Sequence, residues 1–436
     1  MKLFTSKDTL ADKITFYHLA FFAASLPLDR YIGELILASF IIHSLIHIKT
    51  DEIKTLPVKK VLLLQGVFFV TLIATLYTSN LHQAFKEWEK QLAIFVFPLL
   101  LAVGPAGFNR YRLPILMALV FSCMACIAYL EWNVFATIRY YNLGSGELLS
   151  ARFINWNFAA PLDIHPTFMA MYVALSLTLL LSLSFSATSG LVVKTASGVS
   201  AALLLFSLLQ LGSKAVLISL LLLLVVVLMH SVIQRRKIQA FILIGLLITP
   251  VAFTLSSPAF RQRFITSLAN DITTSKPRIL TDENRMVRWR VALDLVAQKP
   301  LRGYGTGAEL TVLKNEYFKR KLYSSFINDL NAHSQYLSFL IRAGLPGLLL
   351  YVLLLYNGFS IAVKRRDVQM LCFMLLIAVV SVSENILDVN KGIFFYSFFF
   401  SLFLFLPQGK KVNMAKRHSR VGSVRHFQVE KSSVGI

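Results

Sequence analysis

The chain alternates between long apolar runs and short polar links. Twelve runs reach or approach the roughly 17–25 residues that a helix needs to cross a bilayer. Their approximate bounds are 14–28, 32–48, 61–78, 91–107, 113–131, 165–186, 191–211, 215–231, 238–255, 335–360, 368–383 and 391–407. The pattern predicts an all-α polytopic membrane protein with about twelve transmembrane helices, in which residues 1–436 form a single integral membrane domain.

Composition supports this prediction. Hydrophobic residues make up 56% of the chain and charged residues 15%, with a mean hydropathy of +0.64. A soluble protein carries about 25% charged residues, so the chain is typical of a membrane protein. The first apolar run lacks a small-residue cleavage site after it, and we expect it to be retained as a span rather than removed as a signal peptide.

Positive charge is distributed unevenly between the two sides of the predicted bundle. Twelve spans place both termini on one side, which carries 23 of the 44 Lys and Arg residues, against seven in the short links of the other side. Because cytoplasmic links are typically basic, both termini are predicted to be cytoplasmic. Topology and attraction to anionic membrane lipids then account for much of the net charge of +22, without a nucleic-acid partner. Segment 408–436 is expected to be a basic cytoplasmic tail.

One long link departs from this charge distribution. Residues 256–334 lie on the far side and hold 13 Lys and Arg against seven Asp and Glu. Long loops in compact proteins are usually functional. We therefore expect a large, partly helical loop on the far side of the membrane that carries the function.

A capped helix and a turn are predicted inside this loop. Thr281 or Asp282 can cap the helix, and Pro300 followed by three glycines ends it. Apolar residues recur at helical spacing, namely Met286, Trp289, Leu293 and Val296.

The same helix places Arg285, Arg288 and Arg290 in its first turns, where cations oppose the helix dipole. One interpretation is a basic solvated face. The other is an anion site, because guanidinium groups bind phosphate oxygens in a bidentate manner.

Further polar residues fall on the same predicted face of the membrane. Lys214 lies at the end of a span, where lysine often only extends its ammonium group to the interface. His165 opens the sixth span, and Glu384 and Asp388 lie in the last far-side link. His333 marks the point where the long loop returns to the membrane. It is either satisfied by hydrogen bonds of the loop or placed for proton transfer to an amphiphilic substrate.

Metal binding and transport find little support in the sequence. The three cysteines, Cys123, Cys126 and Cys372, fall inside apolar runs without further ligands nearby, so no metal site is expected. The predicted spans hold almost no charge, and no internal repeat is evident. Both observations disfavour a polysaccharide or lipid transporter.

Three segments together resemble the O-antigen ligase family, part of a group that also contains O-antigen polymerases and bacterial protein O-oligosaccharyltransferases. They are "LGSKAVL", "RMVRWRVALDLVAQKPLRGYGTG" and "NAHSQYLSFLIRAGLPGLLL". The last segment, after a long far-side loop, is the most specific. The family usually has Ser-Arg-Gly in the first motif, where this chain has "SKA". Lys214 keeps the charge but lacks the fork geometry of arginine.

The resemblance implies a GT-C-like membrane glycosyltransferase of the bacterial inner membrane. Such ligases transfer O-antigen polysaccharide from undecaprenyl diphosphate to a lipid A–core sugar on the periplasmic face. The resemblance further implies inversion at the anomeric carbon and no metal or other cofactor. The alternatives within the group are an O-antigen polymerase and a protein O-oligosaccharyltransferase.

Roles for individual residues follow from this chemistry. The leaving lipid diphosphate gains negative charge, so Lys214, Arg285 and Arg288 are the predicted diphosphate-binding residues. His333 is the predicted catalytic residue, either as general base or as a group that positions the donor. Supporting roles are assigned to His165, Glu384 and Asp388.

Overall fold

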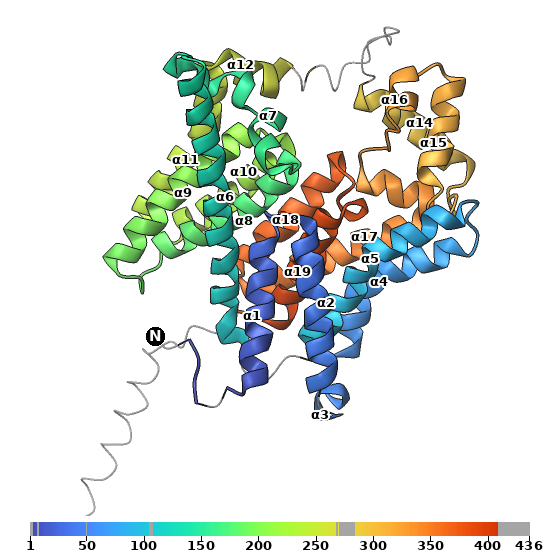
Figure 1. Ribbon diagram of the computed structural model, residues 1–436, viewed down its shortest axis with the longest axis horizontal. Coiled ribbons are helices and arrows are strands. Elements are labelled where there is room, and N and C mark those ends of the chain that lie inside the picture. The colour runs from blue at the N-terminus through green and yellow to red at the C-terminus, as the bar shows by residue number, and fades with distance from the viewer. Residues whose placement is uncertain are drawn as a thin grey trace, which may run out of the picture.

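The computed structural model describes residues 3–6, 8–48, 50–103, 108–266, 269 and 284–408, and this part of the chain is helical and without strands. Each of the twelve predicted apolar runs corresponds to a helix (Figure 1). These helices are α1 (Leu10–Ser25), α2 (Arg30–His47), α4 (Val58–Thr75), α5 (Leu81–Ala102), α6 (Arg112–Tyr140), α8 (Pro166–Ser184), α9 (Leu191–Leu211), α10 (Lys214–Ile233), α11 (Lys237–Ser256), α17 (Gln335–Arg365), α18 (Val368–Ser383) and α19 (Asn390–Phe405).

The chain is a multi-pass membrane protein. Among the described residues, six helices are long and apolar enough to cross a membrane by length and composition, namely α4, α6 with its preceding turn, α8, α9, α10 and α17. Shorter apolar helices lie at 237–249, 368–383 and 390–405. The all-helical membrane class is confirmed, whereas the count of twelve spans stays a prediction.

The interior of the bundle is built on α8 and α19. Every residue of α8 from Pro166 to Leu180 is buried, as is α19 from Gly392 to Leu404. A helix that is apolar on all sides is buried in a large protein, and both helices have this character. Helix α8 packs on α9, α19 packs on α5, and α18 packs on α10 and α17.

Short helices connect these elements. They are α3 (Thr50–Lys54), η1 (Phe108–Tyr111), η2 (Ser145–Leu149), η3 (Ala151–Phe153), α7 (Trp156–Ala159), η4 (Ala160–Leu162) and η6 (Ile386–Asp388).

The predicted long loop is partly helical, as expected. It contains α12 (Pro258–Arg261), the π-helical turn η5 (Gln262–Thr266), α14 (Arg285–Gln298), α15 (Glu309–Lys319) and α16 (Tyr323–Ile327). Figure 1 shows α12 and α14–α16 at the end of the bundle opposite α3. The loop and α3 thus lie at opposite ends of the bundle, while the side of the membrane that each faces stays a prediction. The tail from residue 409 onward lies outside the described residues.

The helix predicted around the arginines is confirmed, but Leu293 of its predicted apolar face points away from the core. Helix α14 starts after Asn284, and the suggested caps Thr281 and Asp282 lie outside the described residues. Leu293 is 51% exposed, whereas the neighbouring positions Val291 and Leu295 are buried. The reason is tertiary, because α14 packs against α15 and α17 in a small second core. Its buried members are Val291, Ala292, Leu295, Leu313, Tyr317, Leu322, Ala332 and Ile341.

Helix α17 is interrupted at Gly344, which adopts φ +63° and ψ −160°. Pro346 follows and has no N–H to donate to the carbonyl of Arg342, four residues earlier. The loop supplies the missing donors. The N–H of Tyr304 donates to Ile341 O at 2.7 Å, and that of Gly305 donates to Arg342 O at 2.9 Å. The glycine turn after α14 is thus a backbone clasp on a broken membrane helix.

The glycines of this turn are required by its geometry. Gly303, Gly305 and Gly307 all have positive φ, at 70°, 96° and 78°. A Cβ on Gly305 would lie 2.5 Å from the Cα of Thr78, and one on Gly303 would lie 2.6 Å from Ile341 O. Since both neighbours are main-chain atoms, no side-chain rotation relieves these contacts.

Replacing Gly305 with alanine should therefore destabilise the protein by on the order of 2–4 kcal/mol, through backbone strain and overpacking. The measurement is thermal unfolding of the detergent-solubilised protein. Gly190→Ala is the matched control, because Gly190 has φ −66° and a Cβ added there would meet no heavy atom within 4 Å. Equal melting temperatures for the two variants would contradict the clasp.

Candidate functional site

His333 occupies the last turn of the long loop, just before α17 begins. Its backbone has φ +47°, in the left-handed region, and its N–H donates to Asn331 Oδ1 at 3.0 Å. The histidine side chain is 30% exposed, and its Nδ1 lies 3.8 Å from Glu384 Oε2. The ring is therefore open to solvent on one side and faces a carboxylate on the other.

Glu384 joins the histidine to the arginine helix. It follows the last residue of α18, and its other oxygen, Oε1, lies 3.5 Å from Arg285 Nη2. Burial by itself raises the pKa of this carboxyl. The His333 ring at 3.8 Å and the positive charges of His165 and Arg285 outweigh burial and lower the pKa below its ordinary value. Glu384 is therefore an ionised partner for the cations around it at neutral pH.

His165 enters the same cluster from α8. It is the N-cap of that helix, where its Nδ1 accepts from the Thr167 N–H at 3.2 Å, and its ring packs edge-on to Trp156 at 4.7 Å. Burial lowers the pKa of His165, opposed by Glu384 and assisted by His333 and two arginines. Burial thus favours the neutral form of the imidazole, and its Nδ1 is already engaged as an acceptor.

The turn that contains Lys214 lies beside His165. Helix α9 ends at Gly212 in the left-handed conformation, and Lys214 begins α10. Ser213 Oγ donates to Thr167 Oγ1 at 3.4 Å, two residues from His165. Arg263, from η5, donates through Nε to Gly212 O at 3.1 Å. The segment "LGSKAVL" is therefore linked to the segment that carries His165 by the Ser213–Thr167 hydrogen bond.

The two predicted arginines of α14 differ in their surroundings. Arg285 keeps 35% of its side chain exposed and pairs with Glu384, whereas Arg288, one turn later, is buried at 7% exposure. Arg290 is exposed. The helix thus presents one accessible guanidinium to the histidine cluster and holds a second inside the protein.

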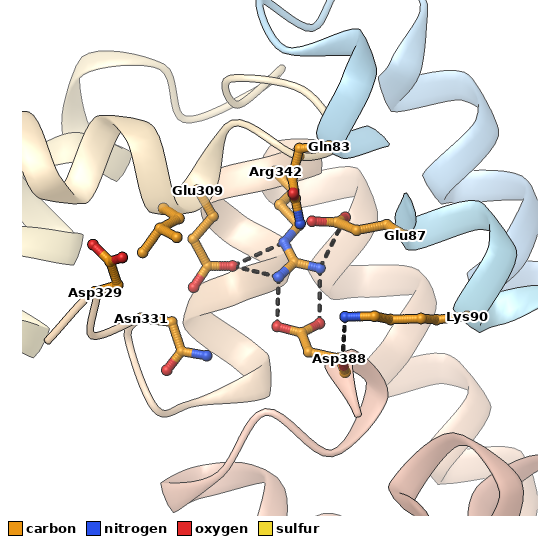
Figure 2. A pocket seen from close by; sticks show the side chains of 10 residues that line it. Gln83, Glu87, Lys90, Glu309, Asp329, Asn331, Arg342 and Asp388 are labelled. Carbon is orange, nitrogen blue, oxygen red and sulfur yellow. Dashed lines mark hydrogen bonds and ion pairs between the residues drawn. The ribbon is translucent and has the colours of Figure 1, made fainter. Parts of the chain in front are cut away.

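A second charged cluster is centred on Arg342 (Figure 2) and adjoins the His333 turn through Glu309, which accepts from the Ala332 N–H. The guanidinium contacts Asp388 through two bonds of 2.8 and 2.5 Å, Glu309 at 2.8 Å, and Glu87 at 3.2 Å. Lys90 lies at its edge and contacts the Asp388 carbonyl at 3.5 Å. These residues line a cavity of about 140 Å³ together with Gln83, Gly307, Leu310, Asp329 and Asn331.

The structure brings most of the predicted residues together. His333, His165, Glu384 and Arg285 form one cluster, and Lys214 lies in the turn beside it. Asp388 is placed elsewhere, because the bidentate pair with Arg342 holds its carboxylate in the second cluster.

Sequence reasoning missed Arg342, Glu309 and Arg263. Arg342 did carry a signal, since it is an isolated charge within the apolar run of the third motif. Glu309 and Arg263 lie among other charged loop residues, and their spacing gives no indication of their partners.

The described residues offer no metal-binding geometry. Within them, no group of three or more His, Cys, Asp or Glu side chains is arranged to hold a metal ion. All three cysteines are free and buried.

Comparison with known proteins gives a match between residues 199–352 and the family described as O-Antigen ligase. The matched segment contains Lys214, Arg285, Arg288 and His333, while His165 and Glu384 lie outside it. The match confirms the resemblance that the three motifs predicted. It indicates a membrane glycosyltransferase-like function of the O-antigen ligase or polymerase type. No curated protein matches the chain.

Replacing Glu384 with glutamine should lower the pKa of His165 further. The Glu384 carboxylate stabilises the imidazolium and thereby raises this pKa, so its removal leaves burial and the neighbouring cations less opposed. The measurement is an NMR titration of histidine-labelled protein in detergent. Glu316→Gln is the control and should leave the titration unchanged, because Glu316 pairs with Lys319 and Arg320 on α15. An unaltered His165 titration in Glu384→Gln would show that the two groups do not interact.

Proposed function

Starting from a chain whose residues 199–352 match the O-antigen ligase family, we propose that the protein transfers O-antigen polysaccharide from undecaprenyl diphosphate to a sugar of lipid A–core. A core hydroxyl attacks the anomeric carbon and forms the new glycosidic C–O bond. The bond from that carbon to the diphosphate breaks, and its electron pair leaves with the lipid diphosphate. The acceptor proton passes to a base, and attack from the opposite face inverts the anomeric centre.

The observation that carries this proposal is the convergence of His333, Glu384 and Arg285 at the membrane-proximal turn of the long loop. The transfer needs a base and a cation close together, because proton removal from the acceptor and charge build-up on the leaving group occur in one step. The cluster offers both, because His333 and Arg285 each lie next to an oxygen of the Glu384 carboxylate.

His333 is assigned as the general base and Glu384 as the group that orients it. His165 is less suited to that role, because its Nδ1 already accepts a backbone N–H. Glu384 is also less suited, because a carboxylate with a lowered pKa is a weak base. In the alternative role, His333 positions the donor. A carboxylate such as Glu384 would then have to accept the proton of the acceptor hydroxyl.

The cations are assigned to the lipid diphosphate. Arg285 is accessible and lies beside the proposed base, and Arg288 adds a buried positive charge on the same helix. Lys214 contributes a point charge from the turn between α9 and α10. We place this site on the periplasmic face of the inner membrane, in a GT-C-like arrangement with both termini in the cytoplasm.

Replacing His333 with alanine should lower transfer by about 10²–10⁴-fold, the usual contribution of a general base. The assay is polysaccharide transfer to lipid A–core by purified protein in detergent, with protein level and melting temperature measured alongside. His82→Ala removes an exposed histidine of α5 and should retain wild-type activity. Full activity of His333→Ala would end the catalytic assignment.

Arg285→Ala and Arg288→Ala should each weaken use of the diphosphate donor by about 10- to 1,000-fold in kcat/KM, because a preorganised charge on the leaving group is lost. The kinetics are measured by varying the donor at saturating acceptor. Arg290→Ala, on the exposed side of the same helix, is the matched control for net charge. If Arg285→Ala and Arg288→Ala both transfer normally, as Arg290→Ala should, neither arginine binds the diphosphate.

Ligase and polymerase reactions are separated by deleting the gene and examining lipopolysaccharide on a gel. Loss of the O-antigen ladder, with full-length polysaccharide retained on its lipid carrier, is the result expected for a ligase. A band with a single repeat on the core would identify a polymerase instead.

A further inference from the structure

The residue before His333 is held at both of its main-chain polar groups. The carbonyl of Ala332 accepts from Trp289 Nε1 at 3.0 Å, and the N–H of Ala332 donates to Glu309 Oε1 at 3.3 Å. Ala332 is fully buried. We call Trp289 and Glu309, together with the Ala332 backbone, the Ala332 clamp.

The clamp lies next to His333, whose backbone conformation is unfavourable for a residue other than glycine. A non-glycine residue in the left-handed region costs on the order of 1 kcal/mol and persists only where its surroundings fix it. His333 has φ +47° and makes one local bond, from its own N–H to Asn331. The clamp fixes the preceding residue and so defines the direction in which the His333 side chain leaves the backbone.

Glu309 is itself fixed from the other side. Its Oε2 accepts from Ser338 Oγ at 2.5 Å and from Arg342 Nε at 2.8 Å, and the side chain is 3% exposed. Figure 2 shows Arg342 between Glu309 and Asp388, with Glu87 on the same guanidinium. Arg342 thus orients Glu309 so that its other oxygen meets the Ala332 N–H.

Trp289 links the clamp to the arginine helix. It lies on α14, four residues after Arg285 and next to Arg288. The indole therefore ties the His333 turn to the same helix that carries the proposed diphosphate-binding arginines. Movement of α14 would shift the histidine and the cations together.

We propose that Trp289 and Glu309 are positioning residues for His333, holding the imidazole at a fixed place relative to Arg285. The proposal rests on the proposed transfer reaction for its functional meaning. Both residues bond to the Ala332 main chain and act on His333 through that backbone. Loss of either should lower kcat, because a displacement of about 1 Å at a reacting group can cost 10²-fold.

The test uses Trp289→Phe, which keeps an aromatic ring and removes the N–H donor. We expect kcat to fall about 10- to 100-fold, with the donor KM changed less than about twofold and the melting temperature preserved. Glu309→Gln should behave in the same direction. Trp88→Phe is the matched control, since it removes an indole bond to Thr75 Oγ1 of 2.9 Å at another place, and it should keep the wild-type kcat.

A second readout does not depend on catalysis. Diethyl pyrocarbonate modifies accessible imidazoles, and mass spectrometry measures the rate at His333 relative to exposed His82 in the same molecule. Trp289→Phe should change the His333 rate several-fold, while Trp88→Phe should not. If His333 reactivity is unchanged, or if kcat and melting temperature fall in parallel in every variant, the positioning role is overturned. If the wild-type protein transfers no glycan, the proposed function fails. The modification rates still test whether Trp289 holds His333 in position.

Discussion

The interruption of α17 is the constraint on which the arrangement of the site depends. A helix broken at Gly344 and followed by Pro346 leaves the carbonyls of Ile341 and Arg342 without helical donors. Unsatisfied carbonyls are costly where water is scarce, so another backbone must supply the donors. The glycine turn after α14 does so through Tyr304 and Gly305. This clasp fixes α14 and α15, and with them the arginines and Glu309, against the membrane helices.

The charged cluster around Arg342, beside the break, also fixes the position of the site. Arg342 projects from α17 one turn before Pro346 and meets carboxylates from three separate parts of the chain, Glu87, Glu309 and Asp388. A buried charge left without a partner costs about 3–5 kcal/mol, so these contacts are strongly held once formed. They join α5, the long loop and the link before α19. The same pairs that neutralise the arginine therefore determine where the His333 turn lies.

Local patterns predicted the elements well and their contacts poorly. Runs of apolar residues located the helices, because a helix satisfies its backbone hydrogen bonds between residues that are close in sequence. The buried face of α14 was predicted only in part, since Leu293 is exposed while the small core against α15 and α17 uses Val291 and Leu295. Asp388 was grouped with Glu384 because they are close in sequence. Their side chains reach different clusters, because Asp388 pairs with Arg342 whereas Glu384 lies beside His333.

The sequence by itself determined the membrane class, the long charged loop, and the residue types at the site. Hydropathy and charge depend on composition along the chain, and the motifs containing Lys214, Arg285 and His333 match a known family. Only the tertiary structure decided that Glu384 lies between Arg285 and His333. It also decided that Arg342 orients Glu309, which bonds to the turn before His333. Contacts between residues far apart in the chain depend on how helices pack and where one of them breaks. No local spacing in the chain encodes that geometry.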